Sequence, residues 1–68
     1  MKAIITKKNQ NGSYDECGMN NRFLTSTYKS VKGLIKYGIS KNWRSQGVRI
    51  EVFNYNLYQE NPDKTIYI

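Results

Sequence analysis

The chain contains no histidine, one cysteine and one proline among its 68 residues. Without histidine it lacks the commonest general base and the commonest metal ligand in proteins. A single cysteine, Cys17, can neither close an intramolecular disulfide nor build a structural zinc site. Lone cysteines are most often buried as small apolar residues, so we assign Cys17 no function. These absences point to a protein of a reducing compartment.

Acidic residues are also few, and their positions disfavour catalysis. They are Asp15, Glu16, Glu51, Glu60 and Asp63. Asp15 and Glu16 are adjacent in a segment expected to be a strand, where successive side chains point to opposite faces. The five glycines are scattered singly, so the sequence holds no Gly-rich phosphate-binding loop. We therefore expect a protein that is not an enzyme and that carries no cofactor and no metal.

Long apolar runs are absent as well. The N-terminal run Ala3–Ile5 is far shorter than the apolar core of a signal peptide, and no stretch approaches the roughly 20 apolar residues of a membrane-spanning helix. No repeat, low-complexity tract or linker divides the chain. A chain this short buries only about 60% of its unfolded surface, which leaves little room for a large enclosed pocket. We expect one small domain over residues 1–68, located in the cytoplasm of a bacterial cell.

Positive charge is what the chain has in excess. Eleven Lys and Arg residues against five Asp and Glu give a formal net charge of +6 and a pI near 9.6. Such an excess favours association with polyanions or acidic protein surfaces. Eight Asn, eight Lys, seven Ile and six Tyr, all with codons rich in A and T, indicate an AT-rich genome such as that of a low-GC bacterium or its phage.

The residue pattern predicts four strands. Lys2–Thr6 is rich in β-branched residues, and Asn9–Gly12 after it contains an Asn-Gly pair, a strong hairpin signal. The return strand is expected over residues 13–17. Gly47–Tyr55 alternates strictly between the two faces of a strand, and Lys64–Ile68 follows a proline-containing turn and is expected to pair back on it.

One helix is predicted between the second and third strands. Thr27–Gly38 has helical periodicity, with hydroxyl side chains at its start that can cap the first turn, and Gly38 is expected to end it in a left-handed conformation. Gly33 inside it suggests close packing against the sheet. The apolar stripe consists of Tyr28, Val31, Leu34, Ile35 and Ile39. We therefore expect an α+β fold of ββαββ order, in which a small antiparallel sheet of about four strands carries one α-helix on one face.

The polar side of this helix is the first candidate binding surface. Its cations recur at helical spacing and continue just past the helix: Lys29, Lys32, Lys36, Lys41 and Arg44. Most polar helix faces are simply solvated. Here, however, no acid occurs between Glu16 and Glu51, whereas an ordinary surface mixes both signs. We interpret this face as a docking surface for phosphates or for an acidic groove.

The outward side of the third and fourth strands is the second candidate. Its binding residues are Arg49, Phe53, Tyr55 and Tyr67, with Glu51 and Tyr58 near them. With one helix available, one sheet face should lack a cover, and exposed aromatics beside arginine can stack on bases or anchor a protein interface. A second packed layer and a homodimer through this uncovered face are the alternatives. Trp43 is interpreted as a cap on the core at the helix end.

These features favour a small, non-enzymatic, basic binding protein encoded by a phage or mobile element. We expect it to dock on a host protein or nucleoprotein and to inhibit or modulate it, as an anti-defence inhibitor does. A direct nucleic-acid-binding module for single strands or a duplex backbone is the alternative, although no RRM motif and no helix-turn-helix pair is present. A further alternative is a dimer that binds a nucleotide-like anion.

Overall fold

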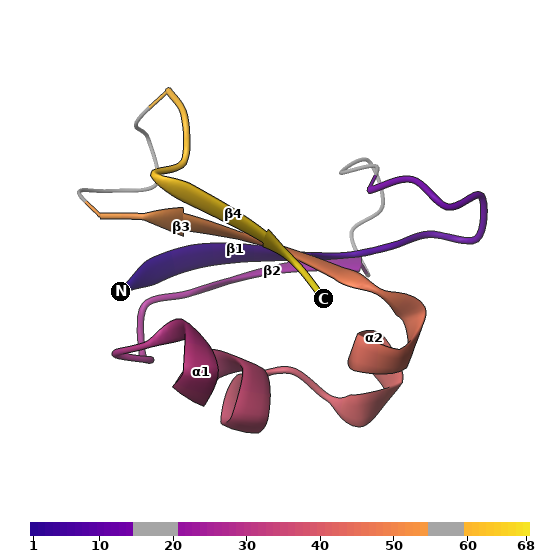
Figure 1. Ribbon diagram of the computed structural model, residues 1–68, viewed down its shortest axis with the longest axis horizontal. Coiled ribbons are helices and arrows are strands. Elements are labelled where there is room, and N and C mark those ends of the chain that lie inside the picture. Colours follow the sequence, from indigo (N-terminus) through magenta and orange to yellow (C-terminus); the bar gives the residue numbers. More distant parts are fainter. Residues whose placement is uncertain (15–20, 55–59) are drawn as a thin grey trace.

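The computed structural model describes residues 1–14, 21–54 and 60–68. Its elements, in chain order, are β1 (Lys2–Lys7), β2 (Arg22–Thr25), α1 (Val31–Gly33), the π-helical turn η2 (Leu34–Gly38), α2 (Lys41–Gln46), β3 (Val48–Phe53) and β4 (Lys64–Tyr67). The strands form one antiparallel sheet in the order β2-β1-β3-β4, and the helical segments lie below it in Figure 1. At this coarse level the molecule is the small α+β protein that the sequence predicts.

The sheet is built around β1, which pairs with β2 on one side and with β3 on the other. Ile5 lies opposite Phe23 of β2 and opposite Ile50 of β3. Side chains alternate along a strand, so residues that face each other across the sheet share one face. This register places Ala3, Ile5, Val48, Ile50 and Val52 together on the face that forms the main core.

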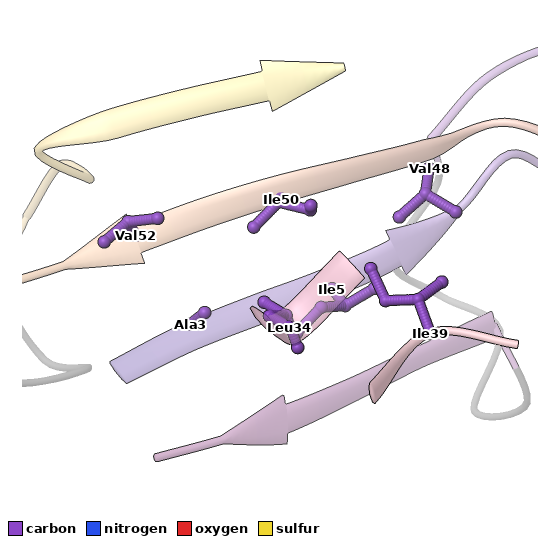
Figure 2. Packing of buried hydrophobic residues seen from close by; sticks show 7 residues of the cluster. All are labelled: Ala3, Ile5, Leu34, Ile39, Val48, Ile50 and Val52. Atoms are coloured by element: carbon purple, nitrogen blue, oxygen red, sulfur yellow. The ribbon is translucent and has the colours of Figure 1, made fainter. Parts of the chain in front are cut away.

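The helical layer closes this core from one side. Leu34 of η2 is completely buried and Ile39, directly after η2, is only 3% exposed. Figure 2 shows both side chains among the core residues of β1 and β3. Half-buried residues, including Tyr28, Val31 and Ile35, surround this cluster. All five residues predicted for the apolar stripe lie in this core or pack against it, but Tyr28 and Ile39 lie outside the helical segments.

The turn of the predicted hairpin is confirmed, but the strand predicted to follow it is wrong. Gly12, with φ of +87°, donates its N–H to the Asn9 carbonyl at 3.0 Å, and Asn9 donates to the Ser13 carbonyl at 2.9 Å. The strand that pairs with β1 from this side is β2, and residues 13 and 14 belong to no strand. Ser13 instead donates its N–H to the side-chain oxygens of Asn9 and Asn11, a local alternative to the ladder. Residues 15–17 of the predicted strand lie outside the described residues.

The single predicted helix is also wrong in detail, because the structure divides it. The first helical segment begins only after Ser30, whose hydroxyl accepts a hydrogen bond from the Gly33 N–H at 3.1 Å. Ile39 is extended, with φ of −114° and ψ of 123°, and ends η2. Ser40 then caps α2 by accepting from the Trp43 N–H at 3.2 Å. A second N-cap signal at Ser40 thus starts a new helix, α2, in a segment where the sequence predicts none.

Gly38 and Gly47 have different reasons to be glycine. Gly38 was expected in a left-handed conformation, but the glycines with positive φ in the described ranges are Gly12 and Gly47. Gly47 ends α2 with φ of +102°, a conformation that side chains disfavour. At Gly38 the reason is space, because a Cβ there would lie 2.7 Å from a ring carbon of Tyr28.

Removing the cap at Ser40 should weaken the fold. We expect Ser40→Ala to lower the free energy of unfolding by about 1 kcal/mol, since the Trp43 N–H then loses its partner in the first turn of α2. Ser45→Ala is the matched control, because that exposed hydroxyl only donates to the Asn42 carbonyl within the same helix. Urea unfolding followed by circular dichroism measures both. Equal losses for the two variants would contradict the assigned cap.

Candidate binding surfaces

Four lysines of the predicted basic set are exposed on the helical layer. Lys32 lies in α1, Lys36 in η2 and Lys41 at the start of α2, whereas Lys29 precedes the first helical segment. The expectation that Lys29 shares a helix face with Lys32 and Lys36 is therefore wrong, because the helix begins later than predicted. We call Lys29, Lys32, Lys36 and Lys41 the basic helical surface.

Arg44 differs from these lysines. It lies in α2 but is half-buried, and its Nε atom is buried without a hydrogen-bond partner in the part of the chain that the structure describes. Its position in α2 directs the side chain partly into the protein rather than into solvent. Of the five predicted cations, Arg44 is therefore the one we leave outside the exposed surface.

Tyr37 adds an aromatic side chain to the basic helical surface. It is 73% exposed, and the Lys36 Nζ atom lies 5.3 Å from the centre of its ring. An exposed ring beside a lysine contributes little to folding, because most of its surface stays in water. Tyr37 was not among the predicted site residues. Its position, one residue after Lys36 and outside the apolar stripe, is the signal that could have identified it.

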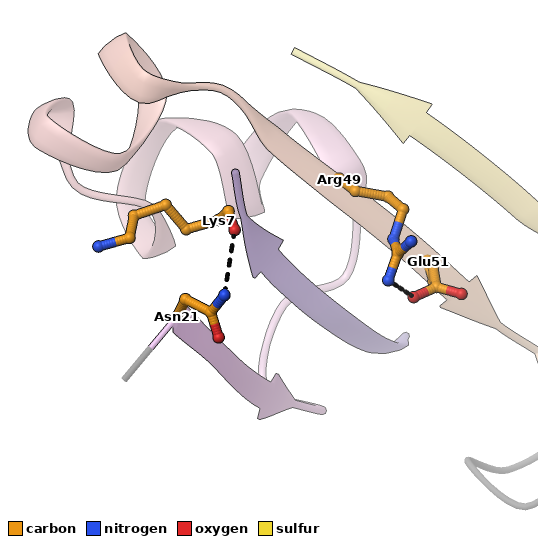
Figure 3. A network of polar contacts seen from close by, with 4 residues as sticks. All are labelled: Lys7, Asn21, Arg49 and Glu51. Atoms are coloured by element: carbon orange, nitrogen blue, oxygen red, sulfur yellow. Dashed lines mark hydrogen bonds and ion pairs between the residues drawn. The ribbon is translucent and has the colours of Figure 1, made fainter. Parts of the chain in front are cut away.

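Trp43 packs at the end of the core, in line with its interpretation as a cap. Its ring lies 5.3 Å from the ring of Phe23, and the Lys7 Nζ atom lies 5.4 Å from the indole centre. The backbone of Lys7 is also bonded: the Asn21 side chain donates a hydrogen bond to the Lys7 carbonyl at 3.5 Å (Figure 3). Trp43 thus ties α2 to the end of β1 and β2.

The outer sheet face, which is turned away from the helical segments, is shielded in its centre. The pairing places Ile4, Thr6, Arg49, Glu51 and Phe53 on this face. Thr6 is fully buried, Phe53 is 5% exposed and Ile4 is 7% exposed. The expectation that Phe53 is an exposed binding residue is therefore wrong, whereas Leu24, Thr65 and Tyr67 on the same face are exposed. The reason is that β1 is apolar toward both sides, as in a strand covered on both faces.

Toward β4, the outer face carries a cluster of charged and aromatic side chains around Tyr14. The Tyr14 ring lies edge-on to the Tyr67 ring at 5.4 Å, and the Arg49 guanidinium and the Lys8 ammonium each lie 5.6 Å from its centre. Arg49 also forms an ion pair with Glu51, with 3.3 Å between Nη2 and Oε1 (Figure 3). The predicted residues Arg49 and Tyr67 are thus brought together, and Tyr55 lies outside the described residues.

Lys8 and Tyr14 are members of this cluster that the sequence analysis missed. The turn at Asn9–Gly12 reverses the chain and returns Tyr14 toward the sheet. Arg49 is only 18% exposed in its side chain and already has Glu51 as a partner. Tyr67, at 62% exposure, remains the most accessible member. The cluster therefore works mainly as packing on the outer face, with Tyr67 at its open margin.

No helix within the described ranges is long and apolar enough to cross a membrane. Among the same residues, no three His, Cys, Asp or Glu side chains gather as metal ligands would. Comparison with models of protein families, with curated proteins and with solved structures gives no match for this chain.

Proposed function

We propose that the protein is a small, non-enzymatic binding protein that docks its basic helical surface on an acidic host protein or nucleoprotein and inhibits or modulates it. The composition supports an origin in a phage or mobile element with an AT-rich genome. The host partner is then met in the bacterial cytoplasm.

The separation of charge supports this proposal most strongly. Between the end of β2 and the start of β3 the chain has five cations and no acid, and four of these cations are exposed lysines. A surface of one sign raises the encounter rate with a partner of the opposite sign and repels partners of the same sign. Lysines whose task is only to keep a protein soluble are normally interspersed with acids.

Direct nucleic-acid binding is the second candidate, and Tyr37 is the observation that favours it. An exposed ring with a lysine ammonium 5.3 Å from its centre can stack on an unpaired base while the cation meets a phosphate. Each base stacked in this way contributes about 1–3 kcal/mol. Tyrosine is equally effective as an anchor in protein interfaces, so Tyr37 alone does not separate the two candidates.

The experiment is capture of the tagged protein from a bacterial lysate with and without nuclease, followed by affinity measurements with the material recovered. Binding of one protein that survives nuclease supports docking on a protein. Loss of all bound material after nuclease, together with tight binding of a single-stranded oligonucleotide that weakens steeply with salt, supports the second candidate.

A matched pair of charge reversals tests the surface itself. Lys36→Glu and Lys64→Glu change the net charge equally, and both side chains are exposed, but only Lys36 belongs to the basic helical surface. We expect Lys36→Glu to weaken binding roughly tenfold and Lys64→Glu to weaken it less than about twofold. Equal effects would show that only net charge matters, and unchanged affinity for Lys36→Glu would remove this surface from the proposal.

A further inference from the structure

Among residues 1–14, 21–54 and 60–68, no strand of the sheet covers the outer edge of β4. It pairs with β3 on one side and is the last strand in the order β2-β1-β3-β4. Val48 and Ile68 exchange both of their backbone hydrogen bonds, at 3.0 and 2.9 Å. Because backbone groups alternate in direction along an antiparallel strand, those of Ile66 point toward β3 and those of Thr65 and Tyr67 point away from the sheet. The outer edge of β4 thus presents donors and acceptors that can pair with another strand.

The side chains along this edge are unusually apolar for a solvent-facing strand. Tyr67 is 62% exposed, Ile68 is 38% exposed and Ile66 is half-buried. Natural edge strands are usually protected by charge, proline or a covering segment. Lys64 is the one charged residue in β4.

We propose that two copies of the chain associate through β4, antiparallel about a two-fold axis at Ile66, and so join their sheets into one. In this register Thr65 of each copy lies opposite Tyr67 of the other, and the two pairs exchange four N–H···O=C hydrogen bonds. Ile66 lies opposite Ile66 of the second copy on the core side. On the outer side the two Tyr67 rings become diagonal neighbours, a spacing that aromatic side chains can bridge.

The balance of charge beside β4 supports this register, because Arg49 and Glu51 form an ion pair within each copy. Within one copy Tyr67 lies opposite Arg49, and Thr65 lies opposite Glu51. In the dimer each row therefore runs from Arg49 and Tyr67 of one copy to Thr65 and Glu51 of the second copy. Every row across the joint carries one cation and one anion on its outer face. On a chain with a net charge of +6, such a balanced strip lets two copies approach with little local repulsion.

The opposite edge of the sheet, β2, does not share this property. By the same alternation, Arg22 and Leu24 direct their backbone groups outward from β2. A two-fold pairing at Phe23 would make the Arg22 side chains of two copies diagonal neighbours, and within each copy Arg22 lies in one row with Thr6 and the cation Arg49. Like charges in such positions are destabilising. β4 is therefore the edge that fits a second copy.

Hydrogen exchange of the wild-type protein, measured by NMR at several concentrations together with sedimentation equilibrium, tests the proposal. We expect a monomer–dimer equilibrium in which the amides of Thr65 and Tyr67 gain protection as concentration rises. The amides of Ile66 and Ile68 should be protected at all concentrations, since they bond to β3. A protein that stays monomeric up to about 1 mM would overturn the proposal. So would a dimer that protects Arg22 and Leu24 instead.

Two variants at one position sharpen the test. Thr65→Pro removes an N–H that points away from β3, so the ladder within the monomer stays intact, whereas Thr65→Val keeps that N–H. We expect Thr65→Pro to raise the dimer dissociation constant tenfold or more and Thr65→Val to change it less than about twofold. Continued protection of Ile66 and Ile68 shows that the variant is folded. A folded Thr65→Pro protein that dimerises like wild type would contradict the pairing.

Discussion

Replacing Leu34 with alanine is expected to lower the free energy of unfolding by about 2–5 kcal/mol. Leu34 is completely buried and belongs to the cluster that joins the helical layer to β1 and β3 (Figure 2). Its removal leaves a cavity that short helical segments cannot refill by a small shift. A domain of this size has only about 3–10 kcal/mol of total stability, so this loss is a large fraction of the total and the variant should melt well below the wild type. Thermal unfolding followed by circular dichroism measures the effect.

Leu24→Ala is the control for the same chemical change at an exposed position. Leu24 lies in β2 and is 55% exposed, so its truncation should cost less than about 1 kcal/mol. Because 1 kcal/mol shifts the melting temperature of such a domain by about 4–8 °C, the two variants should differ clearly. Similar melting temperatures would mean that Leu34 does not hold the two layers together.

Alanine substitutions at Gly33 and Gly38 are expected to change stability in opposite directions. At Gly38 a Cβ would lie 2.7–2.9 Å from ring carbons of Tyr28 and from Cδ1 of Leu34, so these side chains must move. We expect Gly38→Ala to cost about 1–3 kcal/mol, as overpacked sites do. At Gly33 the nearest atom to a new Cβ is the Ser30 hydroxyl oxygen at 3.4 Å, an ordinary contact. Gly33→Ala should therefore stabilise the protein by about 0.5–1 kcal/mol through helix propensity.

Urea unfolding of the two glycine variants and the wild type, under one set of conditions, measures the sign of each change in the free energy of unfolding. The pair controls for the added methyl group, since each variant gains the same atoms within the same helical stretch of residues 31–38. Loss of stability in both variants would mean that the backbone at Gly33 is constrained in a way that its open surroundings do not explain.

The sequence was sufficient to predict two kinds of feature. These are strands in which apolar and polar residues alternate, and turns that depend on nearby side chains. The third strand follows from Val48, Ile50 and Val52 at every second position, and all three lie in the core. The turn before β4 was signalled by Pro62 and its neighbours, and Asp63 does donate its N–H to the Val52 carbonyl at 2.8 Å. These features depend on residues close in sequence, so a single sequence contains the necessary information.

Choices between competing local signals were not predictable. Thr25, Ser26, Thr27, Ser30 and Ser40 all have hydroxyl groups, and only packing against the sheet decides which ones cap helices. The partner of β1 was likewise assigned by proximity to the hairpin turn, whereas β2 pairs with β1 from farther along the chain. Such long-range pairing depends on the whole core.

The candidate surfaces also had a predictable part and an unpredictable part. The exposure of Lys32 and Lys36 followed from their polar positions in a helical pattern, whereas Lys41 was expected just past the helix and lies in α2. The burial of Phe53 did not follow from alternation in β3, but the uninterrupted apolar run Ala3–Ile5 in its partner β1 was an overlooked signal. A strand that is apolar on consecutive positions is covered on both sides, and Phe53 beside it in β3 is covered as well.

The central place of β1 has a consequence for how the nascent protein folds. β1 is made before the other strands of the sheet, yet its longest pairing is with β3, which begins only at Val48. Until residues 48–53 have left the exit tunnel, the apolar side chains of β1 have no lasting cover and are open to capture by chaperones. The first strand of this sheet can therefore settle only after the third has been made, and folding of the sheet is expected to be a late, cooperative event rather than a stepwise one.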